Sequence, residues 1–200
     1  QTIRLKGQGL RGPDGSVGAV CGVPGQPCGL GFAPDGSLLV ASMLDRRILR
    51  LAGGRLSEHA DLSGLAPFHL NDMLVDGSGG AWVGNFGWDA AADPAIRPTV
   101  LVRVDPDGSP RVAADGLVFP NGIVLTPDGR TLIVAETFAS RITAFDVAPD
   151  GSLANRRLWA ALADRPPGAT MEEAFASGLP LPDGLALDAE GAVWMGDAGG

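Results

Sequence analysis

The sequence is poor in cysteine and lysine and has no long apolar run. Its two cysteines, Cys21 and Cys28, are too few for a disulfide scaffold and lack the spacing of metal ligands, so we expect two free thiols. Lysine occurs only at Lys6 and the formal net charge is -8, which argues against a nucleic-acid-binding surface and against binding to an anionic membrane. No stretch approaches the roughly eighteen apolar residues of a transmembrane helix.

Glycine and proline, by contrast, are plentiful. The 30 glycines and 16 prolines are spread along the whole chain, which predicts many tight turns and therefore many short elements. An apolar content of 45% is typical of a folded chain, and this length suffices for one domain with a sizeable core. We therefore expect a single all-β domain over residues 1–200.

One block of sequence recurs four times. It begins with a small or polar residue, continues as a short apolar strand, turns at a glycine and continues as a second apolar strand. The copies start 43, 50 and 62 residues apart. They are CGLGFAPDGSLLVAS from Cys28, NDMLVDGSGGAWVGN from Asn71, NGIVLTPDGRTLIVAE from Asn121 and DGLALDAEGAVWMGD from Asp183.

Four Pro-Asp-Gly turns indicate how many strands each block contains. Two of them, at 34–36 and 127–129, lie inside the blocks, and two more, at 106–108 and 149–151, close later hairpins. Each repeat therefore holds about four strands, which at this spacing is typical of a propeller blade. The last interval is longer because of residues 163–180, which we expect to form a loop with one helical turn at Met171–Ala176. A helical solenoid would need a period of 3.6, and a sandwich would lack the internal copies.

The starts of three blocks resemble one known family. The stretches FHLNDMLVDGSGGAWVGNFG, FPNGIVLTPDGRTLIVAETFASRITAFDVAPDGSLANRRLWA and LPDGLALDAEGAVWMGD resemble the senescence-marker-protein/gluconolactonase family of regucalcin-like lactonases. The resemblance runs from about Gly25 to the end of the chain. It implies a β-propeller of the six-bladed type, of which this chain covers roughly four blades. We accordingly expect an incomplete propeller domain that lacks the N-terminal strands and the last blades.

The resemblance also implies a divalent cation in the central channel. On the family pattern the metal ligands here are the amide oxygen of Asn121 and the carboxylate of Asp183. Oxygen ligands suit a hard cation, so Ca²⁺ is expected, with Zn²⁺, Mn²⁺ and Mg²⁺ as alternatives. The family's third ligand is a Glu upstream of the matching region, and no Glu precedes Glu58 here. The 200 residues alone are therefore expected to bind metal weakly and to lack activity.

Three further positions carry over from the family as substrate contacts. Asn71 matches a residue that hydrogen-bonds the substrate, and Asp89 lies where the family has an acidic contact. His69 lies where some members have Arg, whose bidentate fork a His cannot offer. Asp72, beside Asn71, is expected to bond the backbone. Trp82 and Trp194 occupy equivalent strand positions and are expected in the core.

The function implied is hydrolysis of a sugar lactone or a similar cyclic ester by a hydrolase of carboxylic ester bonds. The cation would polarise the carbonyl, and Asp183 would serve as the catalytic base. The alternative is a non-catalytic ligand-binding or scaffold propeller, in which Asn121-Gly122 and Asp183-Gly184 are turns and Asp89 is a solvated acid. No Gly-x-Ser-x-Gly elbow favours a serine hydrolase. We expect a small-molecule lactone as partner, no nucleic acid or membrane, and a cytoplasmic location; the oligomeric state stays open.

Overall fold

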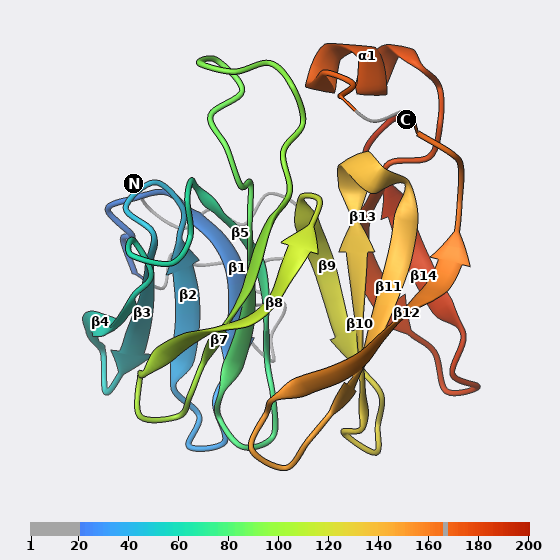
Figure 1. Cartoon of the computed structure of the whole chain (residues 1–200). Helices are drawn as coiled ribbons and strands as arrows, with labels where there is room; N and C mark the ends of the chain where they lie inside the picture. The colour runs from blue at the N-terminus through green and yellow to red at the C-terminus, as the bar shows by residue number, and fades with distance from the viewer. Residues whose placement is uncertain (1–20, 166–167) are drawn as a thin grey trace, which may run out of the picture.

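Four antiparallel sheets stand side by side in the computed structural model, which describes residues 21–165 and 168–200 (Figure 1). The first sheet contains β1 (Pro27–Phe32), β2 (Leu38–Ser42), β3 (Arg47–Ala52) and β4 (Arg55–Asp61). The second contains β5 (Leu70–Val75), β6 (Ala81–Asn85), β7 (Thr99–Val104) and β8 (Pro110–Leu117). The third contains β9 (Pro120–Leu125), β10 (Thr131–Glu136), β11 (Arg141–Val147) and β12 (Leu153–Ala161), and the fourth β13 (Pro182–Leu187) and β14 (Val193–Asp197). The all-β prediction is confirmed, as are the four strands per repeat in three of the sheets.

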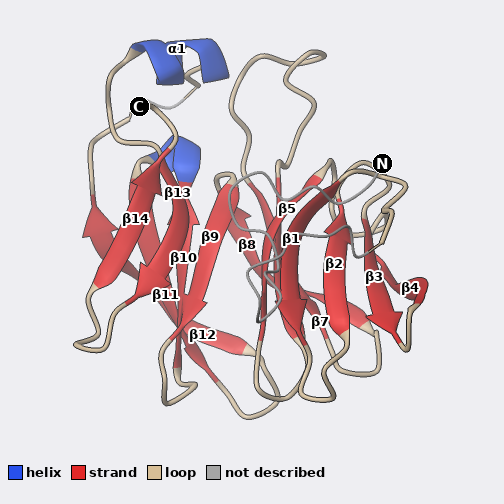
Figure 2. Ribbon diagram, turned by 180° about the vertical axis from the view of Figure 1, so that it is seen from behind, coloured by secondary structure: helices blue, strands red, loops and turns tan. Residues whose placement is uncertain are grey.

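The first strand of each sheet lies at its inner edge. Strands follow chain order within every sheet, and each inner strand lies beside the next one, β1 beside β5, β5 beside β9 and β9 beside β13 (Figure 2). Each inner strand starts at the end of the sheets where the long loops lie, and it turns back at the opposite end. The starts of the four repeats are thereby gathered at one place.

The cores lie between neighbouring sheets. Along β10, Leu132 and Val134 pack on the second sheet beside Trp82, whereas Ile133 packs on the fourth sheet beside Leu185. Successive side chains of a strand point to opposite faces, and both faces of the third sheet are covered. This explains why the strand reads as a continuous apolar run.

Two tryptophans at equivalent repeat positions differ in burial. Trp82 is 1% exposed, which confirms its predicted core position, but Trp194 is 65% exposed, so that prediction is wrong. Trp82 packs against Leu101 and Phe145. Trp194 lies on β14, the last strand of a two-stranded sheet, and no described strand lies beyond it. Burial is thus decided by the neighbouring sheet and not by the position within the repeat.

The Pro-Asp-Gly turns form as predicted. Gly36 and Gly129 have φ of 81° and 72°, a backbone region that residues with a Cβ rarely adopt. The amide of Gly129 donates to the Thr126 carbonyl at 2.8 Å, which closes the turn. Asp128 Oδ1 accepts from the amide of Arg130 at 3.0 Å, so the aspartate stabilises the turn through its own side chain.

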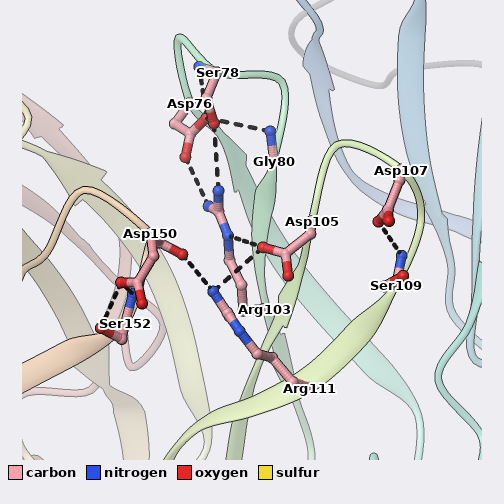
Figure 3. Close-up of polar contacts among 10 residues, drawn as sticks. All are labelled: Asp76, Ser78, Gly80, Arg103, Asp105, Asp107, Ser109, Arg111, Asp150 and Ser152. Atoms are coloured by element: carbon pink, nitrogen blue, oxygen red, sulfur yellow. Dashed lines mark hydrogen bonds and ion pairs between the residues drawn. The ribbon is translucent and has the colours of Figure 1, made fainter.

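A buried arginine holds the turn end of the second sheet (Figure 3). Arg103 is 3% exposed, and its Nη1 lies 2.7 Å from Asp76 Oδ2. Its guanidinium also lies 4.2 Å from the centre of the Trp82 ring. Arg111 pairs with Asp105 at 3.2 Å and donates to the Asp150 carbonyl at 2.6 Å, which links the second sheet to the third.

Two long connections meet at the opposite end. Residues 86–98 join β6 to β7, and residues 162–181 contain α1 (Met171–Ala176), whose predicted helical turn is confirmed. Ala95 forms an isolated bridge with Thr170, the residue that caps α1. A short 3-10 turn, η1 (Thr137–Ala139), follows β10 at the same end. Within the described residues we find no helix of a length and hydropathy suited to a bilayer.

Candidate active site

The second residue of every innermost strand interrupts an otherwise regular ladder. These residues are Cys28 on β1, Asn71 on β5, Asn121 on β9 and Asp183 on β13. The strand pairing shifts register at the same point in all four sheets. A bulge bends its strand and re-aims the side chain. At the block starts, a bulge therefore turns the polar side chains out of the regular alternation of the strand.

The side chains of Asn121 and Asp183 meet across two sheets. Asn121 Nδ2 donates to Asp183 Oδ1 at 2.6 Å and to Thr137 Oγ1 at 3.2 Å. The Thr137 hydroxyl donates its proton to the Pro182 carbonyl at 2.8 Å, so it can only accept a hydrogen bond from Asn121. This fixes the orientation of the amide. No described residue donates to Asn121 Oδ1, which is therefore free to bind a ligand.

The glycine after Asn121 allows the two strands to approach. A Cβ at position 122 would come 2.3 Å from the carbonyl oxygen of Asp183. Real Cβ atoms do not approach an oxygen so closely, so only glycine fits there. The Asn-Gly pair combines a polar side chain with the backbone contact that brings its partner within reach.

Asn71 lies beside the Asn121–Asp183 pair. Its Nδ2 donates to the Pro120 carbonyl at 3.4 Å, one residue before Asn121. Cys28 Sγ donates to the Asn71 carbonyl at 3.1 Å. Burial raises the pKa of the Cys28 thiol to about 12, so this side chain is a neutral donor at ordinary pH.

A cavity of about 630 Å³ runs along the inner strands, and Asp72 lies in its wall together with Cys28, Gly122 and Gly184. Among the described residues no group donates to the Asp72 carboxylate, so the expected bond to the backbone is not found there. Burial, and then the negative charge of Asp183, raise the pKa of Asp72. The sequence did not predict that this second carboxylate would line the cavity, because its placement there depends on the bulge.

The described residues offer oxygen donors for a cation but no complete metal cluster. No three His, Cys, Asp or Glu side chains within residues 21–165 and 168–200 are grouped closely enough to hold a metal ion. The Asn121 amide oxygen and the carboxylate of Asp183 are hard donors, which match Ca²⁺ or Mg²⁺ better than a soft metal. The donor chemistry therefore fits the predicted cation.

His69 and Asp89 line a different, smaller cavity of about 300 Å³. His69 stacks on Phe68 with ring centres 3.9 Å apart. Asp89 is exposed, and its Oδ1 accepts from the amide of Ala91 at 3.0 Å within its own loop. No hydrogen bond between described residues joins either side chain to Asn121 or Asp183. The predicted site residues thus fall into an Asn121–Asp183 pair with Asn71 beside it, and a separate His69–Asp89 cavity.

Thr137 is the site residue that sequence reasoning missed. It is 2% exposed and follows the apolar strand β10 directly, where a threonine carries no distinctive signal. Its two partners, Asn121 and Pro182, lie 16 and 45 residues away along the chain. Only the juxtaposition of the third and fourth sheets shows that its hydroxyl orients an amide.

Comparison with known proteins identifies a protein family whose model matches most of this chain. The family model described as SMP-30/Gluconolactonase/LRE-like region matches residues 12–200. An L-arabinolactonase of Azospirillum brasilense is 30% identical over 165 residues, which cover 82% of this chain and 50% of that protein. The chain spans about half the length of the curated relatives it matches.

Solved structures have the same arrangement of sheets. A gluconolactonase of Xanthomonas campestris superposes with a TM-score of 0.67 at 28% identity, over 92% of this chain and 60% of that one. A calcium-binding protein, regucalcin, of Agrobacterium tumefaciens strain C58 superposes with a TM-score of 0.66 at 24% identity, over 91% of this chain and 56% of that one. The second likeness extends to the fold alone.

Proposed function

Because the chain belongs to the SMP-30/gluconolactonase/LRE-like family, we propose that this protein hydrolyses a lactone at the channel end where Asn121 and Asp183 meet. The observation that carries the proposal is the contact between these two side chains, which come from different repeats. A scaffold propeller would not need an amide oriented by a buried hydroxyl. The proposal includes a six-bladed propeller, with the four sheets as blades of one domain.

A divalent cation completes the proposed site. Asn121 Oδ1 and the Asp183 carboxylate would hold it, and Ca²⁺ is the expected ion because both groups are hard oxygen donors. Mg²⁺, Mn²⁺ and Zn²⁺ are alternatives. When bound, the ion supplies Lewis acidity to the lactone carbonyl.

The protein's own residues supply the remaining chemistry. Asp183 Oδ1 is engaged by Asn121, which leaves Oδ2 as the oxygen that removes a proton from the attacking water. Water forms the new bond to the carbonyl carbon, the ring C–O bond breaks, and the proton passes to the ring oxygen. The product is a hydroxy acid. Asn71 is suited to hydrogen-bond the substrate beside this pair, and His69 and Asp89 are the further proposed substrate contacts.

The test is a panel of γ- and δ-lactones, including sugar lactones, assayed by acid release. The protein at its natural length is used, with and without a chelator and after adding back each of the four metals. We expect metal-dependent ring opening and a loss of about 10²–10⁴-fold in Asp183→Asn, because proton transfer by a positioned base contributes about that much. Asp115→Asn, a change of an exposed carboxylate with no described hydrogen bond, is the matched control and should retain full activity.

Two results would count against this function. Activity that survives both chelation and Asp183→Asn would remove the cation and the base from the reaction. A folded, metal-binding protein that opens none of the lactones would leave the ligand-binding propeller as the better account.

A further inference from the structure

An aromatic cavity lies beside the candidate active site. Its volume is about 300 Å³, at the lower end for small-molecule pockets and suited to a single ring or a short alkyl chain. The wall is formed mostly by aromatic and aliphatic side chains, among them Phe68, Phe86, Trp88, Phe119 and Met171.

The aromatic side chains hold one another in place. Phe119 lies 4.7 Å from Phe86 and 4.8 Å from Phe138, measured between ring centres, and Trp88 meets Phe119 edge-on at 6.2 Å. Trp88, Phe119 and Phe138 are each at most 9% exposed. Interlocked rings with few free torsions form a wall that is shaped before any ligand arrives.

The cavity is placed by the same strands as the Asn121–Asp183 pair. Phe119 precedes Asn121 by two residues, and His69 precedes Asn71 by two residues. Met171 closes the cavity from α1, whose start is fixed by the bridge between Ala95 and Thr170. The wall therefore stands at the end of the sheets where the polar residues emerge.

The cavity offers few partners to a polyhydroxylated chain. Its polar groups are His69, Asp89 and the indole N–H of Trp88, and one Asp89 oxygen already accepts from its own loop. A chain with several hydroxyl groups would lose more bonds to water than these three side chains replace, which is unfavourable, whereas an apolar group would gain from leaving water.

We propose that this cavity is the subsite for an alkyl or aryl substituent of the lactone, so that the preferred substrates are apolar-substituted lactones and not sugar lactones. The inference rests on the proposed function, which it narrows. The lactone ring would lie at Asn121 and Asp183, and its substituent would lie between Phe86, Phe119 and Met171.

The experiment compares γ-phenyl-γ-butyrolactone, unsubstituted γ-butyrolactone and glucono-δ-lactone. We expect kcat/KM for the phenyl lactone to exceed that for the unsubstituted one by about tenfold or more, the range by which apolar pockets discriminate. Ala91→Trp places an indole at the cavity wall and should reduce this ratio to about one. Ala92→Trp, on the next exposed residue and outside the wall, is the matched control and should leave the ratio unchanged.

The inference and the proposed function fail in distinguishable ways. Ring opening with no preference for the phenyl lactone, or with the same ratio in Ala91→Trp and Ala92→Trp, overturns the subsite and leaves the lactonase intact. If no lactone is opened, calorimetric binding of the two γ-lactones decides the subsite alone. Binding of the phenyl lactone about tenfold tighter, and weakened only by Ala91→Trp, supports it; equal binding overturns it.

Discussion

Glu136 is the most densely bonded acid in the described chain, and its replacement gives a sharp test of the structure. The side chain is 0% exposed at the end of β10. Its two oxygens accept from five donors. These are Arg141 Nε and Nη2 at 2.8 Å each, Thr143 Oγ1 at 2.5 Å, the Val118 amide at 2.8 Å and Arg156 Nη2 at 3.3 Å.

Glu136→Gln should destabilise the fold by about 1–3 kcal/mol, because a buried donor loses its acceptor, while the Arg141 and Arg156 side chains, 36% and 37% exposed, stay accessible to water. One Glu136 oxygen, an acceptor, would be replaced by the amide nitrogen of Gln, a donor. This nitrogen would then face another donor, either the Val118 amide or a guanidinium N–H of Arg141. Because typical domains have only about 5–15 kcal/mol of stability, this loss is large. Urea unfolding followed by tryptophan fluorescence measures it. Glu172→Gln, at an exposed residue of α1, should change stability by less than about 0.5 kcal/mol.

The pH dependence gives a second readout. Burial by itself would raise the pKa of Glu136, but the hydrogen bonds from Arg141 and Thr143 outweigh it and hold the pKa below its ordinary value of 4.5. A depressed folded pKa contributes stability above pH 4.5, and this contribution is lost as the pH falls through the lower folded value. The stability gap between wild type and Glu136→Gln should therefore shrink below pH 4.5. A gap under about 1 kcal/mol at neutral pH, or one that does not change with acid, would refute the reasoning.

Two further substitutions test the site and the turn end. Thr137→Val should lower the free energy of unfolding in urea by about 1–3 kcal/mol, because it leaves the Pro182 carbonyl and one Asn121 N–H without their partner. Thr137→Ser keeps the hydroxyl and should retain most of the stability that Thr137→Val loses. Equal stability of the two variants would contradict the assigned bonds. Arg103→Met should cost about 3–5 kcal/mol because it removes the guanidinium from an ion pair whose side chains are only 3% and 10% exposed. Arg97→Met, which breaks an exposed pair, should cost at most about 1 kcal/mol. Similar losses from both variants would show that burial does not set the difference.

Much of the fold could be predicted because its signals are local. The turn glycines, the apolar strands and each copy of the repeated block can be recognised within about fifteen residues. Period-two alternation also assigns side chains to the two faces of a sheet without knowledge of the neighbouring sheet. The repeat also placed Asn71, Asn121 and Asp183 at equivalent positions. The helical turn at Met171–Ala176 was predicted for the same reason.

The contacts that make a site could not be predicted in this way. The strand starts bulge at the same point in all four sheets, and Asp72, next to one of these bulges, lines the cavity along the inner strands. Trp194 is exposed although its repeat counterpart Trp82 is buried, because burial depends on which sheet stands beside it. His69 and Asp89, the other predicted substrate contacts, line an aromatic cavity beside the polar pair, and no described hydrogen bond joins them to Asn121 or Asp183.

The amino-acid sequence by itself determined the repeat, the strand and turn chemistry and the positions at which polar groups enter the inner strands. Only the tertiary structure decided that Asn121 meets Asp183, that Thr137 orients the amide between them and that rings from several loops enclose a cavity beside them. Propensity and periodicity act over a few bonds, whereas these contacts join residues tens of positions apart. Their geometry is set by how neighbouring sheets pack, a property that no local stretch encodes.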